Sequence, residues 1–342
     1  MAITRFIAKC IIILVLVSCT EDKPESRISF IEMTISETQD SLLNGRVSCR
    51  EVVQGYLDRI AFYDKAKGIN AITVLNPKAL EKADAIDSIV TRGGQLPELF
   101  CTPILVKDNF DTHDLVTSGG SITLAENFPP DDAFMVRKLR EAGAIIIAKT
   151  NMAEWAFSPR ETVSSSFGRT ANAYDINYVP AGSSGGTASG VAANFALAGL
   201  GSDTGNSIRG PSSHLALFGI RSTIGLTSRD GVIPLVYDRD IAGPMTRTVE
   251  DGVRLFNVLA GYDPADPLTI PNVREENYLD FLDNDGLSGK RIGILRVLLD
   301  HEDADSEIKD IFANALLDME SAGAVIIDNI EISRFEELKN EI

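Results

Sequence analysis

The sequence predicts an α/β fold in which a β-sheet is covered by helices on both faces. Apolar residues recur at helical spacing in some segments and form short continuous runs in others, and the two kinds alternate along the chain. A chain of 342 residues that is 44% hydrophobic can bury a large core. No internal repeat or low-complexity linker interrupts the pattern. Alternation of this kind favours a sheet with helices on either side.

The first expected elements are two packing helices between residues 28 and 64, where residues 52, 53, 56, 57 and 60 are apolar at helical spacing. The apolar run 104–106 then predicts a buried strand. The next helix is expected to begin at Asp131 and Asp132, two residue types that favour N-caps, and to end before Gly143. A buried strand at 144–148 follows it.

The same order returns near the C-terminus. Residues 292–295 predict a strand, residues 308–321 predict a helix closed by Gly323, and residues 325–327 predict a further strand. The last five residues lie inside an expected helix. This ending is typical of a truncated domain.

The N-terminus is predicted to be a secretory signal. Arg5 and Lys9 precede a short apolar run, and small residues lead to Cys19. The segment 16–19 resembles a bacterial lipobox, which implies cleavage before Cys19 and lipidation of that residue. We therefore expect a signal peptide at 1–18, a tether at 19–27 and one domain at 28–342, with the protein at the periplasmic or outer-membrane face of the cell envelope. A plain cleaved signal is the alternative.

Charge and cysteine content limit the partners and cofactors. The 49 acidic and 32 basic residues give a formal charge of −17, which opposes a nucleic-acid partner. Within the domain only Cys49 and Cys101 remain, too few for a disulfide framework, and both are expected to be buried thiols. No residues show the spacing of a metal site, so no metal or organic cofactor is expected.

The stretch 179–209 carries the strongest indication of chemistry. It contains two paired serines flanked by glycines, a helix of small residues, and then Leu-Gly-Ser-Asp-Thr-Gly-Asn-Ser-Ile-Arg. Glycines let the backbone approach a ligand closely. The segment lacks the Gly-Lys-Ser/Thr ending of a phosphate-binding loop, so a nucleotide site is not indicated.

This stretch closely resembles the amidase signature family of serine hydrolases. Three further motifs match in the same order: 103–109 (Pro-Ile-Leu-Val-Lys-Asp-Asn), 149–155 (Lys-Thr-Asn-Met-Ala-Glu-Trp) and 243–247 (Gly-Pro-Met-Thr-Arg). The resemblance covers most of 28–342. It implies the amidase signature fold, with a large mixed β-sheet covered by helices on both faces, and cleavage of linear amide C–N bonds. Family members extend beyond the point where this chain stops.

The resemblance places the family's serine–cis-serine–lysine triad on Ser207, Ser183 and Lys107. Ser207 would be the nucleophile, Ser183 a proton relay after a cis peptide bond, and Lys107 the base, provided that burial lowers its pKa. The oxyanion hole would be formed by the backbone N–H groups of Thr204, Gly205, Asn206 and Ser207. Ser184, Asp203 and Arg209 are expected to support the loop, although Asp203 and Arg209 could be a structural ion pair only.

Two residues depart from the family pattern. Asn206 stands where a second glycine is common before the nucleophile, and it adds a side chain beside the oxyanion hole. Asparagine tolerates left-handed backbone conformations better than most residues. Thr102 stands where a glycine usually precedes Pro103.

Three other functions also fit parts of the sequence. Residues 182–186 match a Gly-x-Ser-x-Gly nucleophile elbow with Ser184 as nucleophile, but only His214 and His301 lie downstream as bases. A binding-only surface lipoprotein with an inactive amidase scaffold is the non-enzymatic alternative. The glutaminase-like subunit of the tRNA-dependent amidotransferase is disfavoured by the predicted signal and the negative charge. The preferred interpretation is a lipoprotein amidase that acts on a small-molecule or peptide amide.

Overall fold

The centre of the protein is a six-stranded sheet. The computed structural model describes residues 29–328, 330–335 and 337. The strand order is β1-β3-β2-β6-β8-β7. The bounds are β1 Ile72–Leu75, β2 Thr102–Lys107, β3 Ala144–Thr150, β6 Ala198–Asp203, β7 Phe218–Gly219 and β8 Ile241–Thr246. Strands β2, β3 and β6 run parallel, whereas β1 pairs with β3, and β8 with β6 and β7, in antiparallel fashion. The sheet is mixed, as the family resemblance implied.

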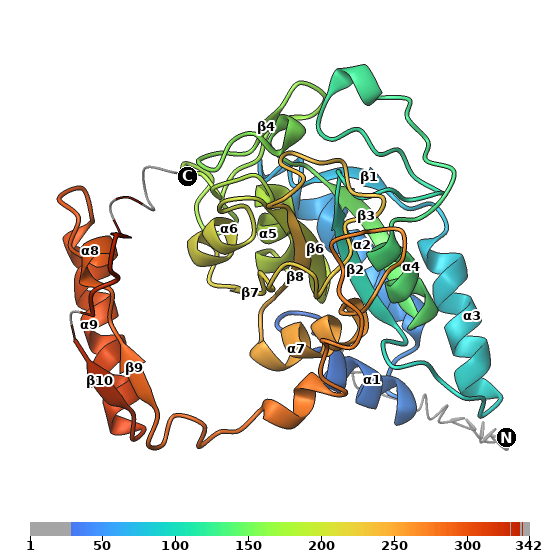
Figure 1. Cartoon of the computed structure of the whole chain (residues 1–342). Coiled ribbons are helices and arrows are strands. Elements are labelled where there is room, and N and C mark those ends of the chain that lie inside the picture. Colours follow the sequence, from blue (N-terminus) through green and yellow to red (C-terminus); the bar gives the residue numbers. More distant parts are fainter. Residues whose placement is uncertain (1–28, 329, 336, 338–342) are drawn as a thin grey trace, which may run out of the picture.

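Helices cover both faces of this sheet. Helix α4 (Phe134–Glu141) connects β2 to β3, and helix α5 (Gly185–Ala192) lies between β3 and β6. The two connections run in opposite directions across β2, and crossovers between parallel strands are right-handed. The helices must therefore lie on opposite faces, and Figure 1 shows α5 to the left of the strands and α4 to the right. The predicted α/β class is confirmed.

The N-terminal helices begin at side-chain caps. Helix α1 (Ile35–Leu43) and helix α2 (Cys49–Tyr63) both start with a capping box, in which a Ser or Thr side chain and a Glu three residues later satisfy free N–H groups. These are the two helices expected between residues 28 and 64. Helix α3 (Ala79–Thr91) packs against α2 and β3.

Helix α4 begins two residues later than predicted. Its N-cap is Ala133, which has no side-chain cap, so Asp131 and Asp132 do not cap it. Asp132 instead accepts the N–H of His113 and pairs with Arg140. The carboxylate is therefore used to fasten a neighbouring loop. The predicted end is correct, because Gly143 follows the helix with φ of +87°.

The two domain cysteines form a disulfide, which corrects the prediction of buried thiols. Cys49 opens α2, and Cys101 directly precedes β2. Both side chains are fully buried, and their Cα atoms are 5.6 Å apart across 52 residues of sequence. The bond ties the first long helix to the central sheet.

The remaining elements lie between or after those of the core. They are η1 Ile122–Leu124, η2 Glu154–Ala156, β4 Val163–Ser164, β5 Gly168–Arg169, α6 Arg209–His214, α7 Val249–Leu259 and η3 Tyr278–Phe281, followed by β9 Arg291–Gly293, α8 Arg296–Leu299, α9 Ser306–Ser321 and β10 Val325–Ile327. We call the last four the C-terminal unit. The predicted C-terminal helix and both strands are confirmed within a few residues, and Gly323 closes α9 with φ of +90°.

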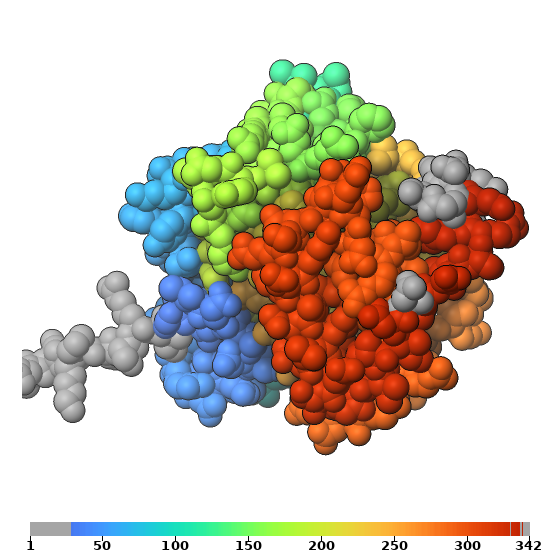
Figure 2. Space-filling view, turned by 90° about the vertical axis from the view of Figure 1, so that its left-hand side faces the viewer, coloured from blue at the N-terminus to red at the C-terminus, as the bar shows by residue number. Residues whose placement is uncertain are grey.

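The C-terminal unit lies apart from the central sheet. Strands β9 and β10 form their own parallel pair against α9. Figure 1 shows an extended segment leading to this unit, and Figure 2 shows it, in orange to red, in front of the body. Several large apolar side chains of α9 are exposed, among them Ile308, Ile311 and Leu317.

The predicted signal peptide, the tether and Cys19 lie outside the described residues. Within the part of the chain that the structure describes, no helix is both long enough and apolar enough to cross a membrane.

Candidate active site

The predicted site residues meet at the carboxyl ends of two parallel strands. Lys107 is the last residue of β2, and Asp203 is the last residue of β6, its neighbour in the sheet. The connections leaving β2 on its two sides go to opposite faces. In α/β sheets such a reversal of strand order opens a crevice at the carboxyl ends, where ligands bind. The fold therefore places Lys107 where a ligand would reach it.

The Lys107 ammonium group is buried and surrounded by oxygen atoms. Its Nζ donates to Ser183 Oγ (2.7 Å), to Ser202 Oγ (2.8 Å) and to the Ser202 carbonyl (3.3 Å). These three contacts match the three N–H bonds of a protonated lysine. When the amine is neutral, one position becomes a lone pair, and the carbonyl cannot donate to it. A hydroxyl must then supply the proton, and Ser183 makes the shortest contact.

Burial also sets the protonation state of this lysine. The loss of hydration lowers the pKa of Lys107 from 10.5 to about 7, against the opposing pull of the Asp203 and Asp240 carboxylates. A base is most effective when its pKa lies near the working pH. Lys107 therefore meets the chemical condition that the sequence could only assume.

Ser183 is held between a tight turn and the start of α5. The peptide bond between Gly182 and Ser183 is cis, as the family resemblance implied. The Ser184 hydroxyl donates to the Ser202 carbonyl (3.1 Å), and the Ser184 N–H donates to the Ser207 carbonyl (3.3 Å). Ser184 thus joins the paired-serine loop to the Ser207 turn. A Cβ on Gly186 would lie 2.1 Å from the Asn151 carbonyl oxygen, so this helix start tolerates no side chain there.

Ser207 stands on a turn that Asp203 organises. One Asp203 oxygen accepts the N–H groups of Ile208 (3.0 Å) and Arg209 (3.2 Å), and the carboxylate pairs with the Arg209 guanidinium (3.0 Å). Burial disfavours the charged carboxylate, but the hydrogen bonds from Arg209 and Ile208 outweigh it and lower the pKa of Asp203. The Asp203–Arg209 ion pair is therefore present, and it fixes the residues on both sides of Ser207.

The Ser207 hydroxyl has no hydrogen-bond partner among the described residues. The contact from Ser207 to Ser183 that a relay requires is therefore not made in this structure, although Ser183 already touches Lys107. Ser207 is only 5% exposed. Catalytic hydrogen bonds are often long without substrate and tighten when it binds.

The backbone N–H groups of residues 204–207 are free to bind an anion. None of them donates to an acceptor in the described part of the chain, and no atom lies within 4 Å of a Cβ placed on Gly205. Four adjacent free donors beside a serine suit the developing negative charge of an acyl-transfer transition state.

Three polar residues of the site were not predicted. Ser202 accepts from Lys107 and from the amide of Asn109 (3.0 Å). Asp240 accepts the Thr204 hydroxyl and the N–H groups of Leu235 (2.8 Å) and Val236 (3.1 Å), so it holds the loop 235–240 against the Ser207 turn. Ser202 and Asn109 lie inside the quoted motifs, and the parallel strands β2 and β6 could have indicated their meeting. Nothing in the sequence indicated Asp240.

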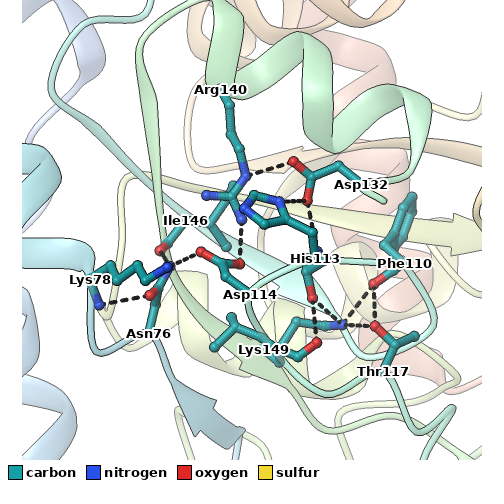
Figure 3. Close-up of polar contacts among 12 residues, drawn as sticks. Asn76, Lys78, Phe110, His113, Asp114, Thr117, Asp132, Arg140, Ile146 and Lys149 are labelled. Atoms are coloured by element: carbon teal, nitrogen blue, oxygen red, sulfur yellow. Dashed lines mark hydrogen bonds and ion pairs between the residues drawn. The ribbon is translucent and has the colours of Figure 1, made fainter. Parts of the chain in front are cut away.

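A second buried lysine holds the loop that follows β2. Lys149 donates to the Phe110 carbonyl (2.7 Å) and the Thr117 hydroxyl (2.8 Å), and it lies 3.7 Å from Asp108 (Figure 3). Burial lowers the pKa of Lys149 to about 8 despite the Asp108 and Asp111 carboxylates. Since Asp108 directly follows Lys107, this contact fixes the strand end that carries Lys107.

One group of side chains nearby could offer metal ligands. His113, Asp114 and Asp132 present ligand atoms within 4.8 Å of one another. The Arg140 guanidinium already pairs with Asp114 (2.6 Å) and Asp132 (3.0 Å), as Figure 3 shows. A bound cation would have to displace that positive charge, so the group is better described as an ion-pair cluster.

The nucleophile-elbow alternative finds no support in the geometry. The Ser184 hydroxyl is fully buried and donates to the Ser202 carbonyl. His214 lies 3.4 Å from the Val179 carbonyl, and His301 is exposed beside Asp303. Among the described residues no histidine contacts Ser184.

Fold and site together define an α/β protein with a buried serine–lysine centre at the ends of parallel strands. Comparison with known families agrees, because the family model described as Amidase matches residues 51–342. The chain belongs to the amidase family, as its signature motifs implied.

The relatives include both stand-alone amidases and one component of a transamidase. A glutamyl-tRNA(Gln) amidotransferase component from Alkaliphilus metalliredigens is 40% identical over 86% of this chain and 59% of its own length. The crystal structure of the native peptide amidase from Stenotrophomonas maltophilia superposes with a TM-score of 0.84 and 36% identity over 91% of this chain and 64% of that one. The corresponding amidotransferase component from Thermotoga maritima gives 0.76 and 28% over 90% and 63%. The chain thus spans less than two thirds of these relatives.

Proposed function

We propose that this protein hydrolyses a carboxylic amide through an acyl-enzyme, with Ser207 as nucleophile, Ser183 as relay and Lys107 as base. The observation that carries the proposal is the 2.7 Å hydrogen bond between Ser183 and a fully buried Lys107 whose pKa is about 7. It lies beside a serine turn with four free N–H groups.

In the acylation step, neutral Lys107 takes the Ser183 hydroxyl proton while Ser183 takes the proton of Ser207. The Ser207 oxygen then forms a bond to the amide carbon, and the carbonyl oxygen becomes an oxyanion that the N–H groups of 204–207 stabilise. Return of the proton through Ser183 to the leaving nitrogen allows the C–N bond to break. An amine or ammonia leaves, and the acyl group stays on Ser207.

In the second step, water attacks the acyl-enzyme. Lys107 accepts the water proton through Ser183, and the acid departs as Ser207 regains its hydrogen. The substrate would be a small-molecule or peptide amide, and a solved relative that is itself a peptide amidase supports this class. The mechanism uses side chains and backbone groups of this chain alone.

The rate should rise with pH through the pKa of Lys107. The neutral amine is the active form, so kcat/KM is expected to increase up to about pH 7 and then level off. The folded pKa lies below that of an unfolded lysine, so the contribution of this group to stability also increases with pH between about 7 and 10.5. A pH–rate profile with an activated amide tests the first point. A rising limb near pH 10 would show that the base is not a buried lysine.

Covalent labelling tests the proposal most directly. A fluorophosphonate probe is expected to modify the purified protein at Ser207, as located by peptide mapping. Ser207→Ala should abolish labelling, and Lys107→Met, which keeps the side-chain volume, should slow it strongly. Absence of labelling in a folded protein would favour the inactive, binding-only alternative, and labelling at Ser184 would reject the assignment.

A second candidate function is that of an amidotransferase component, which the curated relatives favour. Such a component would release ammonia from glutamine only together with a partner. The closer superposition on the peptide amidase and the charge of −17 favour the stand-alone enzyme. Hydrolysis of a simple amide by the isolated protein would decide for the latter.

We also propose that the protein works in the cell envelope, anchored by lipid on Cys19. The Cys49–Cys101 disulfide supports this location, because such bonds persist in oxidising compartments. Cell fractionation should recover the protein with membranes.

A further inference from the structure

A basic cavity lies beside the Ser207 turn. It has a volume of about 580 Å³ and is bordered by the segment around Pro159, by Asn206 and by the first turns of α6. Its charged lining residues are Arg160, Arg209 and His214, and no carboxylate belongs to the lining among the described residues. In a protein with a formal charge of −17, a cavity of this composition is unusual.

Positive charge remains after the local ion pairs are counted. Asp203 pairs with both Arg209 (3.0 Å) and Arg221 (3.3 Å), so one carboxylate faces two guanidinium groups. Arg209 Nε and Nη2 bind Asp203 and the Gly205 carbonyl, whereas Nη1 has no acceptor in the described chain. Arg160 is exposed and makes no ion pair with a described residue. Both arginines therefore keep free donors at the cavity.

Asn206 connects this cavity to the nucleophile. Its amide donates to the Pro159 carbonyl (3.3 Å), and a Cβ on Gly210 would lie 2.0 Å from it, so the side chain fills the space between the two borders. Asn206 directly precedes Ser207, and successive Cα atoms are about 3.8 Å apart. A group bound in the cavity would therefore lie only a few bonds from a carbonyl held at Ser207.

We propose that this cavity, which we call the basic pocket, binds a carboxylate of the substrate, so that the enzyme prefers amides with a carboxylate near the scissile bond. The planar guanidinium group matches a carboxylate in shape and charge. This inference rests on the proposed amidase function. Two sources of the carboxylate fit the same chemistry, namely the acyl part and the amine part of the substrate.

Two matched pairs of chromogenic amides test the proposal. N-succinyl against N-butanoyl 4-nitroanilide varies the acyl part, and N-acetyl-5-amino-2-nitrobenzoate against N-acetyl-4-nitroaniline varies the amine part. In at least one pair, kcat/KM is expected to be about tenfold higher for the carboxylate, the effect of one charged hydrogen bond. Arg160→Gln should remove the preference and leave the neutral substrates unchanged. Arg92→Gln, an exposed arginine at the end of α3, is the matched control and should change neither.

Binding separates failure of the pocket from failure of the proposed function. In Ser207→Ala, calorimetry should show the carboxylate member of the preferred pair binding about tenfold more tightly than its neutral partner, and Arg160→Gln should abolish the difference. Tighter binding without cleavage of any substrate by the wild type would reject the amidase function and keep the pocket. Equal rates and equal binding within both pairs, or an equal effect of Arg92→Gln, would reject the pocket and leave the function intact.

Discussion

Replacing Lys107 with methionine is expected to lower the kcat of amide hydrolysis by about 10⁴-fold. The methionine keeps the volume of the side chain but cannot accept the proton that reaches it through Ser183. Among the described residues, no other amine contacts the Ser183 hydroxyl. Steady-state kinetics on an activated amide measures the loss, and circular dichroism checks that the variant folds.

The triad residues should also fail as a unit. Ser183→Ala and the double variant Lys107→Met/Ser183→Ala are expected to retain about the same residual rate as Lys107→Met, because groups that act in one proton relay are not additive. Lys149→Met is the matched comparison, since this lysine is equally buried but makes no contact with Ser183. A loss of similar size in Lys149→Met would point to a structural origin and contradict the assignment of Lys107 as base.

Removing the disulfide is expected to destabilise the protein by about 4 kcal/mol. The bond closes a segment of 52 residues, and a cross-link of that span restricts the unfolded chain by about this amount. The double variant Cys49→Ala/Cys101→Ala should therefore unfold at a clearly lower urea concentration than the wild type. A wild-type protein treated with reductant provides the comparison without a change of sequence.

The oxidation state of these two cysteines can be measured in cells as well. Alkylation of intact cells before lysis should leave Cys49 and Cys101 unmodified when the bond has formed. Full alkylation of both, together with an unchanged urea midpoint after reduction, would mean that the disulfide does not contribute to the folded protein. That result would also remove its support for an envelope location.

The sequence predicted the parts of the site that lie within continuous motifs. The apolar run before Lys107 predicted a buried strand, and β2 confirms it because six consecutive residues are buried. Burial of that strand is also what shifts the pKa of Lys107. The closing glycines of α4 and α9 were identified from their position alone, because both adopt positive φ.

Contacts between distant segments were not predictable in the same way. Two lone cysteines 52 residues apart give no pairing signal until α2 is packed against the start of β2. Asp240 reaches Thr204 across 36 residues of sequence through a loop without regular structure. Asp132 was assigned as a cap because its residue type favours caps, but the ion pair with Arg140 decides its place.

The layout of the site also bears on how enzymes of this kind can diversify. Lys107 and Asp203 stand at the ends of sheet strands, where the hydrogen-bond ladder of the core fixes them. The basic pocket is bordered by the loop at Pro159 and by α6, outside that ladder. Mutations in these borders can alter which molecules are accepted while the proton relay keeps its geometry. Selection or engineering for new substrates should therefore accumulate changes at 158–161 and 209–214 before it alters the strand ends.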